Sequence, residues 1–109
     1  MSKIVLTHNN KEYELEYNRQ SVRTMESQGF VLDEITTRPV TMIPLLFSGA
    51  FIKNHRGSNA VKRAVIDEIY DGISDKTGLV RALMEMYMET VNTLTDDSAE
   101  GNVTWALVK

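Results

Sequence analysis

The stretch of sequence that most constrains this fold runs from Thr41 to His55 and is apolar on almost every face of a helix. One face has the helical spacing i, i+3, i+4, i+7, i+8, with Ile43, Leu46, Phe47, Ala50 and Phe51. Met42, Leu45 and Ile52 are apolar on the other faces. A helix that is apolar nearly all round is buried or lies at an interface, and this one is shorter than the roughly 20 residues that span a membrane. The pattern predicts the central helix of a small domain.

The first part of the chain predicts a β-hairpin. Ile4 to Thr7 is a short apolar run, and the polar turn His8-Asn9-Asn10 follows it. Asn tolerates the left-handed backbone that tight hairpin turns need. Residues 12–17 then alternate strictly, with Tyr13, Leu15 and Tyr17 on one face and three glutamates on the other. This period of two predicts a strand that is buried on one side.

Capping residues set the expected helix boundaries. Asn18 is a good N-cap for a helix from Arg19 to Gln28, and Gly29 follows it where a positive φ ends many helices. Phe30 is expected to pack back on Met25. We expect Thr41 to cap the central helix, with Pro44 in its first turn, where a missing N–H is tolerated.

Two further helices are expected after the central one. Ser58 or Asn59 is expected to cap a helix that runs to about Ile73, because apolar residues recur there every four positions. Asp75 or Thr77 starts the last helix, which ends near Leu94. Its apolar face consists of Val80, Leu83, Met84, Tyr87, Val91 and Leu94, and Met86 and Met88 fall outside it.

The chain is expected to end in a tail that is separate from the helices. Residues 96–109 combine an acidic linker with a stretch in which Val103, Trp105 and Leu107 alternate, as they do in a strand. We therefore expect an α+β fold that is mainly α, with a hairpin packed on about four helices in residues 1–95. A strand-like tail completes it.

Composition and motifs speak against several functions. The chain has no cysteine, which removes thiol catalysis and cysteine-ligated zinc. Neither His8 nor His55 belongs to a metal-binding array, and no phosphate-binding or nucleophile motif occurs. Ser48-Gly49 is interpreted as a pair of small residues that admits another helix. We expect no enzyme activity, no cofactor and no metal. The apolar run near the N-terminus is shorter than the core of a signal peptide, so we expect a cytoplasmic protein.

The charges leave one alternative open. The net charge is -3, and the sole local basic cluster contains Lys53, His55, Arg56, Lys62 and Arg63. Nucleic-acid binders usually concentrate positive charge on one face, so this function is disfavoured. The alternative is a small regulatory protein that binds nucleic acid through the helix around Lys62 and Arg63. Asp67, Glu68 and Asp71 are interpreted as a solvated helix face.

Surplus apolar residues predict a partner. One small domain cannot easily cover both the central helix and the methionine-rich last helix, and methionine adapts to varied apolar partners. The candidates for partner binding or self-association are Met42, Leu45, Ile52, Met86, Met88 and Trp105.

Three segments together resemble a known family. They are Glu16-Tyr17-Asn18-Arg19 leading to Val22-Arg23-Thr24-Met25-Glu26 and Gly29-Phe30; Met42 to His55 with Leu46-Phe47 and Gly49-Ala50-Phe51; and Glu100-Gly101-Asn102 with Trp105. In order and spacing they are similar to the small tail assembly chaperones of long-tailed bacteriophages and prophages, in their short form. No one motif among them is catalytic.

The resemblance implies a function in tail morphogenesis. Such chaperones coat the long, apolar, helical tape measure protein before the tail tube forms around it. A programmed frameshift typically yields a longer form whose extra domain recruits the tail tube protein. The resemblance therefore implies a chaperone of the host cytoplasm, absent from the mature virion, that binds tape measure protein and forms a homo-oligomer.

Overall fold

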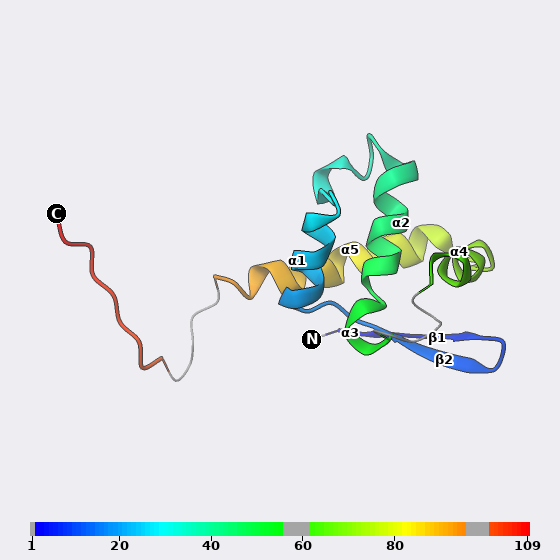
Figure 1. The fold of residues 1–109 in the computed structure, drawn as a ribbon, viewed down its shortest axis with the longest axis horizontal. Coiled ribbons are helices and arrows are strands. Elements are labelled where there is room, and N and C mark those ends of the chain that lie inside the picture. The colour runs from blue at the N-terminus through cyan, green and yellow to red at the C-terminus, as the bar shows by residue number, and fades with distance from the viewer. Residues whose placement is uncertain (1, 56–61, 96–100) are drawn as a thin grey trace.

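A hairpin lies along one side of a group of helices in the computed structural model, which describes residues 2–55, 62–95 and 101–109 (Figure 1). The elements in chain order are β1 (Ile4–His8), β2 (Lys11–Leu15), α1 (Arg19–Ser27), the 3-10 turn η1 (Leu32–Glu34), α2 (Pro39–Gly49), α3 (Ile52–His55), α4 (Arg63–Asp71) and α5 (Lys76–Asn92). The expected class, α+β and mainly α, is confirmed.

The hairpin forms where the alternation predicts it. β1 and β2 pair antiparallel, with His8 opposite Lys11 at the turn. The two turn residues, Asn9 and Asn10, have φ of 52° and 63°. Positive φ at both positions identifies the two-residue turn whose twist suits a hairpin. Tyr13 and Leu15 are buried on the inner face of β2.

Both ends of α1 have the caps that the sequence predicts. The Asn18 side chain accepts a hydrogen bond from the Ser21 amide at 2.7 Å, and the Ser21 hydroxyl accepts one from the Asn18 amide. At the other end Gly29 has a φ of 94°, and its amide donates to the Glu26 carbonyl. The Phe30 amide donates to the Met25 carbonyl at 3.0 Å. These two bonds are the Schellman arrangement expected there.

The central helix differs from the prediction at both ends. It begins at Pro39, two residues before Thr41, so the prediction that Thr41 is its N-cap is wrong. Proline favours the first helical position, where its φ is already helical and no N–H is needed. Pro44 consequently lies inside the helix instead of in its first turn. The helix also ends at Gly49, and the chain turns before α3 begins at Ile52.

The last two helices follow the prediction in part. α4 spans Arg63–Asp71, and the expected caps Ser58 and Asn59 lie outside the described residues. α5 begins after Asp75, whose side chain accepts a hydrogen bond from the Gly78 amide at 3.0 Å, so that N-cap is confirmed. The three acidic residues of the linker, Asp96, Asp97 and Glu100, also lie outside the described part of the chain.

One hydrophobic core joins the hairpin to the helices. The Tyr17 hydroxyl donates to the Leu46 carbonyl at 2.6 Å inside it. Gly49 lets α2 approach α1, because a Cβ at this position would lie 2.3 Å from the Met25 sulfur. The interpretation of Ser48-Gly49 as a close helix contact is confirmed at Gly49. Residues buried in the core include Tyr13, Leu15, Tyr17, Met25, Phe30, Met42, Leu46, Phe47, Phe51, Ile66, Leu83, Met86 and Tyr87.

The tail forms no strand in the described part of the chain. Residues 101–109 have no regular secondary structure, and all nine are exposed. Trp105 is 88% exposed. Figure 1 shows the tail running away from the helices. An isolated strand has no partner for its backbone groups, so the expected strand character is not realised in a single copy.

Candidate partner-binding groove

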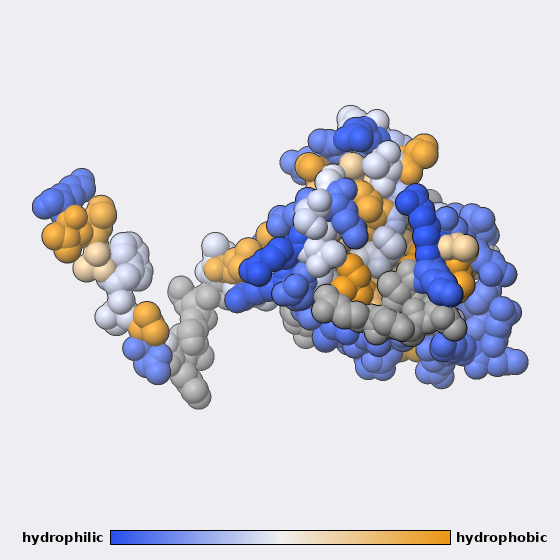
Figure 2. Space-filling view, in the orientation of Figure 1, coloured by the Kyte–Doolittle hydropathy of each residue, from blue (hydrophilic) through white to orange (hydrophobic). Residues whose placement is uncertain are grey.

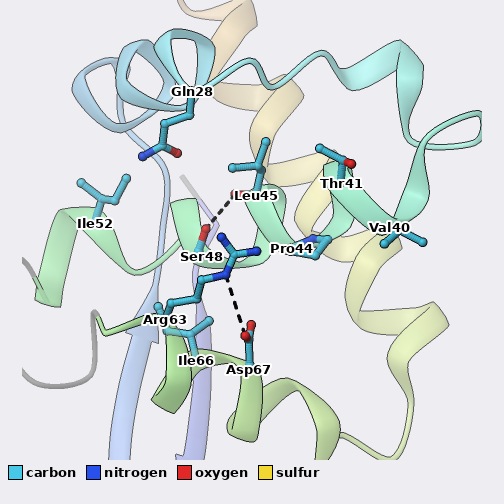
Figure 3. Close-up of a pocket in the computed structure, with 10 residues that line it drawn as sticks. All are labelled: Gln28, Val40, Thr41, Pro44, Leu45, Ser48, Ile52, Arg63, Ile66 and Asp67. Atoms are coloured by element: carbon cyan, nitrogen blue, oxygen red, sulfur yellow. Dashed lines mark hydrogen bonds and ion pairs between the residues drawn. The ribbon is translucent and has the colours of Figure 1, made fainter.

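A groove of about 620 Å³ lies between α2 and α4 and reaches the end of α1 (Figure 3). We call it the α2–α4 groove. Its lining residues are Gln28, Val40, Thr41, Pro44, Leu45, Ser48, Ile52, Arg63, Ile66 and Asp67. Figure 2 shows apolar side chains among polar ones on the face of the molecule that carries these helices.

The register of α2 explains why this face is left open. Met42, Leu46 and Phe47 point into the core and are buried. Leu45 and Ser48 lie one helical step away from that face and are half-buried. Because residues three and four apart share a helical face, Thr41, Leu45 and Ser48 form one wall of the groove. Ile52 of α3 extends that wall past the turn in the chain.

The groove continues beyond its widest part. A second hollow of about 280 Å³ shares Pro44, Ile66 and Asp67 with the first one. It adds Phe47, Tyr70 and Asp71 farther along α4. The two hollows together give a depression that follows the line between two helices. A long depression of this kind suits an extended or helical ligand better than a compact one.

The floor is apolar and the rim carries weakly paired charges. Ile66 lies on the α4 side, and the Arg63 guanidinium reaches toward Ser48 across the groove (Figure 3). Arg63 and Asp67 form an ion pair at 3.9 Å, and both side chains are largely exposed. An exposed pair of this kind contributes about 0–1 kcal/mol. A polar ligand group can therefore displace it at small cost.

A smaller apolar hollow lies on the outer face of α5. It has a volume of about 370 Å³ and is lined by Leu32, Arg81, Met84, Glu85, Met88, Glu89 and Asn92. Met88 is 39% exposed there. Its lining residues are distinct from those of the α2–α4 groove.

The structure separates the six predicted partner residues. Leu45 and Ile52 come together in the α2–α4 groove. Met88 lies in the α5 hollow, and Trp105 is exposed on the tail.

Two of the six are wrongly predicted as surface residues. Met42 is 1% exposed and Met86 is 5% exposed. Both belong to the monomer core, because α2 turns Met42 inward and α5 turns Met86 inward against the neighbouring helices. Neither is available to a partner in this conformation.

The groove also contains residues that the sequence did not single out as partner residues. Val40 and Pro44 belong to α2, and Ile66 belongs to α4. The apolar spacing of the α4 sequence gave no sign that Ile66 also forms the floor of a groove. Val40 lay before the expected start of the helix, and the misplaced boundary hid it.

The described part of the chain uses two members of the basic cluster to contact the hairpin. It holds no group of three or more potential metal ligands. The His55 imidazole accepts a hydrogen bond from the Glu14 amide at 3.0 Å, and Lys53 pairs with Glu16. These two members of the basic cluster thus hold the hairpin to α3. Arg56 lies outside the described residues.

Comparison with known proteins gives one family match. A family model described as "Domain of unknown function (DUF5055)" matches residues 1–108, from the hairpin through the tail. No curated protein and no solved structure matches the chain. Among the described residues no helix has both the length and the apolarity to cross a membrane.

Proposed function

We infer that this chain, which belongs to the DUF5055 family, is a tail assembly chaperone that binds helical segments of a phage tape measure protein. The observation that carries the proposal is the α2–α4 groove, with the half-buried Leu45 and Ile52 on its wall. The resemblance of the sequence to tail assembly chaperones supplies the identity of the client. The function needs no catalysis and no cofactor.

The lining of the groove supports a helical client. The apolar stripe of such a helix presents anchors at i, i+3, i+4 and i+7. Leu45 and Ile52 offer apolar contacts to such anchors, and the buried Ile66 lies beneath them in the lining. Gln28, Ser48 and Arg63 lie at the rim, where the polar flanks of the client would lie. Burial of apolar surface is worth about 25 cal/mol per Å².

The remaining parts of the proposal concern assembly. A tape measure protein is much longer than this chain, so coating it takes many copies and requires self-association. A longer, frameshifted form would recruit the tail tube protein. The chaperone would act in the host cytoplasm. The surface around Met88 and the exposed Trp105 supports contacts between copies.

Co-expression tests the proposal. The cognate tape measure protein is expressed with and without this chain, and the client's soluble fraction is measured. We expect the chain to raise that fraction and to co-purify with the client. The double variant Leu45→Ser, Ile52→Ser is expected to lose both effects while it keeps its melting temperature within a few degrees.

The matched control is Val31→Ser, which removes an exposed apolar side chain outside the groove. It is expected to rescue the client as well as the wild type does. If the wild-type chain at high molar excess does not raise the soluble fraction of the tape measure protein, that protein is refuted as the client. Rescue by the double variant would refute the groove as its binding site.

A further inference from the structure

We propose that residues 103–108 of one copy add as a third strand to the outer edge of β1 in a second copy. The inference deepens the self-association in the proposed function and rests on that part of it. It names the two segments that meet. The argument uses the backbone pattern of the hairpin, the exposed faces of β1 and the alternation of the tail.

The register shows which backbone groups of β1 point outward. In an antiparallel pair, hydrogen-bonded and non-hydrogen-bonded residue pairs alternate. The two-residue turn makes His8 and Lys11 a hydrogen-bonded pair. Leu6 and Ile4 then also bond β2, whereas Val5 and Thr7 point their N–H and C=O groups away from it. In the part of the chain that the structure describes, no hydrogen bond engages those outward groups.

The opposite edge of the sheet is covered at its end nearest α3. The Glu14 amide donates to His55, and the Glu14 carbonyl accepts a hydrogen bond from the Asn54 side chain at 3.2 Å. The Glu16 amide donates to the Ala50 carbonyl at 3.0 Å. Thus α3 and the turn before it occupy this outer edge at Glu14 and Glu16. Along β2 only Glu12, next to the hairpin turn, keeps outward groups that no hydrogen bond engages among the described residues. An added strand therefore has one continuous edge to use, and that edge is β1.

The inner face of β1 is also incomplete. Tyr13 and Leu15 on β2 are buried, but their partners Leu6 and Ile4 on β1 remain half-buried. Val5, on the outer face, is 52% exposed. A third strand with apolar side chains on its inner face would cover the two half-buried residues. Open edges with apolar side chains are templates for strand addition.

The tail has the pattern that such a strand needs. Val103, Trp105 and Leu107 alternate, so one face of an extended tail is wholly apolar. All three are exposed in the single copy. Residues 101–108 contain no charged side chain and no proline, so neither charge repulsion nor a missing N–H opposes pairing. Six residues also match the five-residue length of β1.

The fluorescence of Trp105 can report this contact. Trp105 is the one tryptophan of the chain, and the hairpin and helices therefore contribute no tryptophan fluorescence. The experiment records the emission maximum and the light-scattering mass of the whole chain as the protein concentration rises. We expect a blue shift of the emission and a rise in mass over the same concentration range.

Two variants assign the contact to its two sides. Val5→Pro removes an outward N–H of β1 and leaves the ladder to β2 intact, and Val5→Thr is its matched control. In the tail, the double variant Val103→Pro, Ala106→Pro removes one N–H from each edge of the added strand. One of the two missing N–H groups therefore faces β1 whether the tail pairs parallel or antiparallel to it. The control for this double variant is Val103→Thr with Ala106→Ser. Both proline variants are expected to lose the blue shift and the rise in mass, and both controls to keep them.

Each other outcome overturns the proposal. A blue shift that does not depend on concentration places the tail on its own chain. A concentration-dependent shift that survives Val5→Pro places it elsewhere on the second copy, for instance in the α2–α4 groove. A light-scattering mass that stays at the value for one copy at every concentration would show that the chain does not self-associate. The tail variants make no contact with the folded core in one copy, so their loss of assembly cannot come from unfolding. The assay contains no tape measure protein, so its failure leaves client rescue as a separate result.

Discussion

Removing one hydroxyl group tests how the segment that follows β2 is fixed to α2. The Tyr17 hydroxyl donates to the Leu46 carbonyl at 2.6 Å, and both residues are buried. The Ala50 amide, which lies four residues after Leu46, bonds to the Phe47 carbonyl and not to the Leu46 carbonyl. Tyr17→Phe therefore leaves a buried carbonyl unsatisfied. Such a loss costs about 1–3 kcal/mol.

The expected result is measured by thermal and urea unfolding at pH 7. For a domain of this size, 1 kcal/mol corresponds to about 4–8 °C in melting temperature, so we expect a fall of at least about 4 °C. The control is Tyr13→Phe. Tyr13 is also buried, but its hydroxyl makes no hydrogen bond among the described residues. We expect the control to change the free energy of unfolding by less than about 0.5 kcal/mol.

The same variant makes a prediction about alkaline pH. Burial, and secondarily the neighbouring Tyr87, raise the pKa of Tyr17 well above its ordinary value of 10.0. The unfolded chain therefore loses this proton first as the pH rises, and the wild type loses stability above about pH 10. Tyr17→Phe lacks that contribution. The stability gap between wild type and variant should be constant below pH 10 and narrow above it.

Two results would refute this reasoning. A melting temperature equal to the wild type's would mean that the hydroxyl does not hold α2 to the segment that follows β2. A gap that stays constant to pH 11 would mean that Tyr17 is not buried in its neutral form. Tyr70 and Tyr87 also have raised pKa values. The difference between the two proteins isolates Tyr17 because both proteins contain those residues.

The remaining predictions concern helix packing, capping and burial. Gly49→Ala should cost about 1–3 kcal/mol of overpacking against Met25, whereas Gly72→Ala, whose Cβ would lie 3.6 Å from its nearest neighbour, should be neutral in urea unfolding. Asn18→Ala should cost about 1 kcal/mol through the lost N-cap of α1, and equal stability would contradict the cap. Met42→Ser should lower the free energy of unfolding by about 2–5 kcal/mol through lost packing, whereas Leu45→Ser should lower it much less. Similar losses for the two variants would contradict the assignment of Met42 to the core and Leu45 to the groove.

Local signals predicted the boundaries that depend on neighbouring residues. Asn9 and Asn10 form the turn, Asn18 and Asp75 cap helices, and Gly29 ends α1. Each of these residues acts on backbone groups within three positions. Their effect is therefore readable without the tertiary structure.

The division between core and surface was less predictable. A helix such as α2 is apolar on nearly every face, so the spacing of its apolar residues does not show which face is buried. The neighbouring helices decide it, and they bury Met42 and leave Leu45 on the groove wall. Met86 is buried for the same reason. The groove itself depends on how far α4 stands from α2, and no local pattern in the sequence specifies that distance.

The most direct test of the account is the footprint of the client on the chaperone. Methyl resonances of the isolated chain are compared with those of the complex with a tape measure fragment. We predict shifts at Leu45, Ile52 and Ile66, with Met84 and Met88 unchanged by the client. Shifts confined to Met84 and Met88, with Leu45, Ile52 and Ile66 unchanged, would contradict the assignment of the α2–α4 groove as the client site.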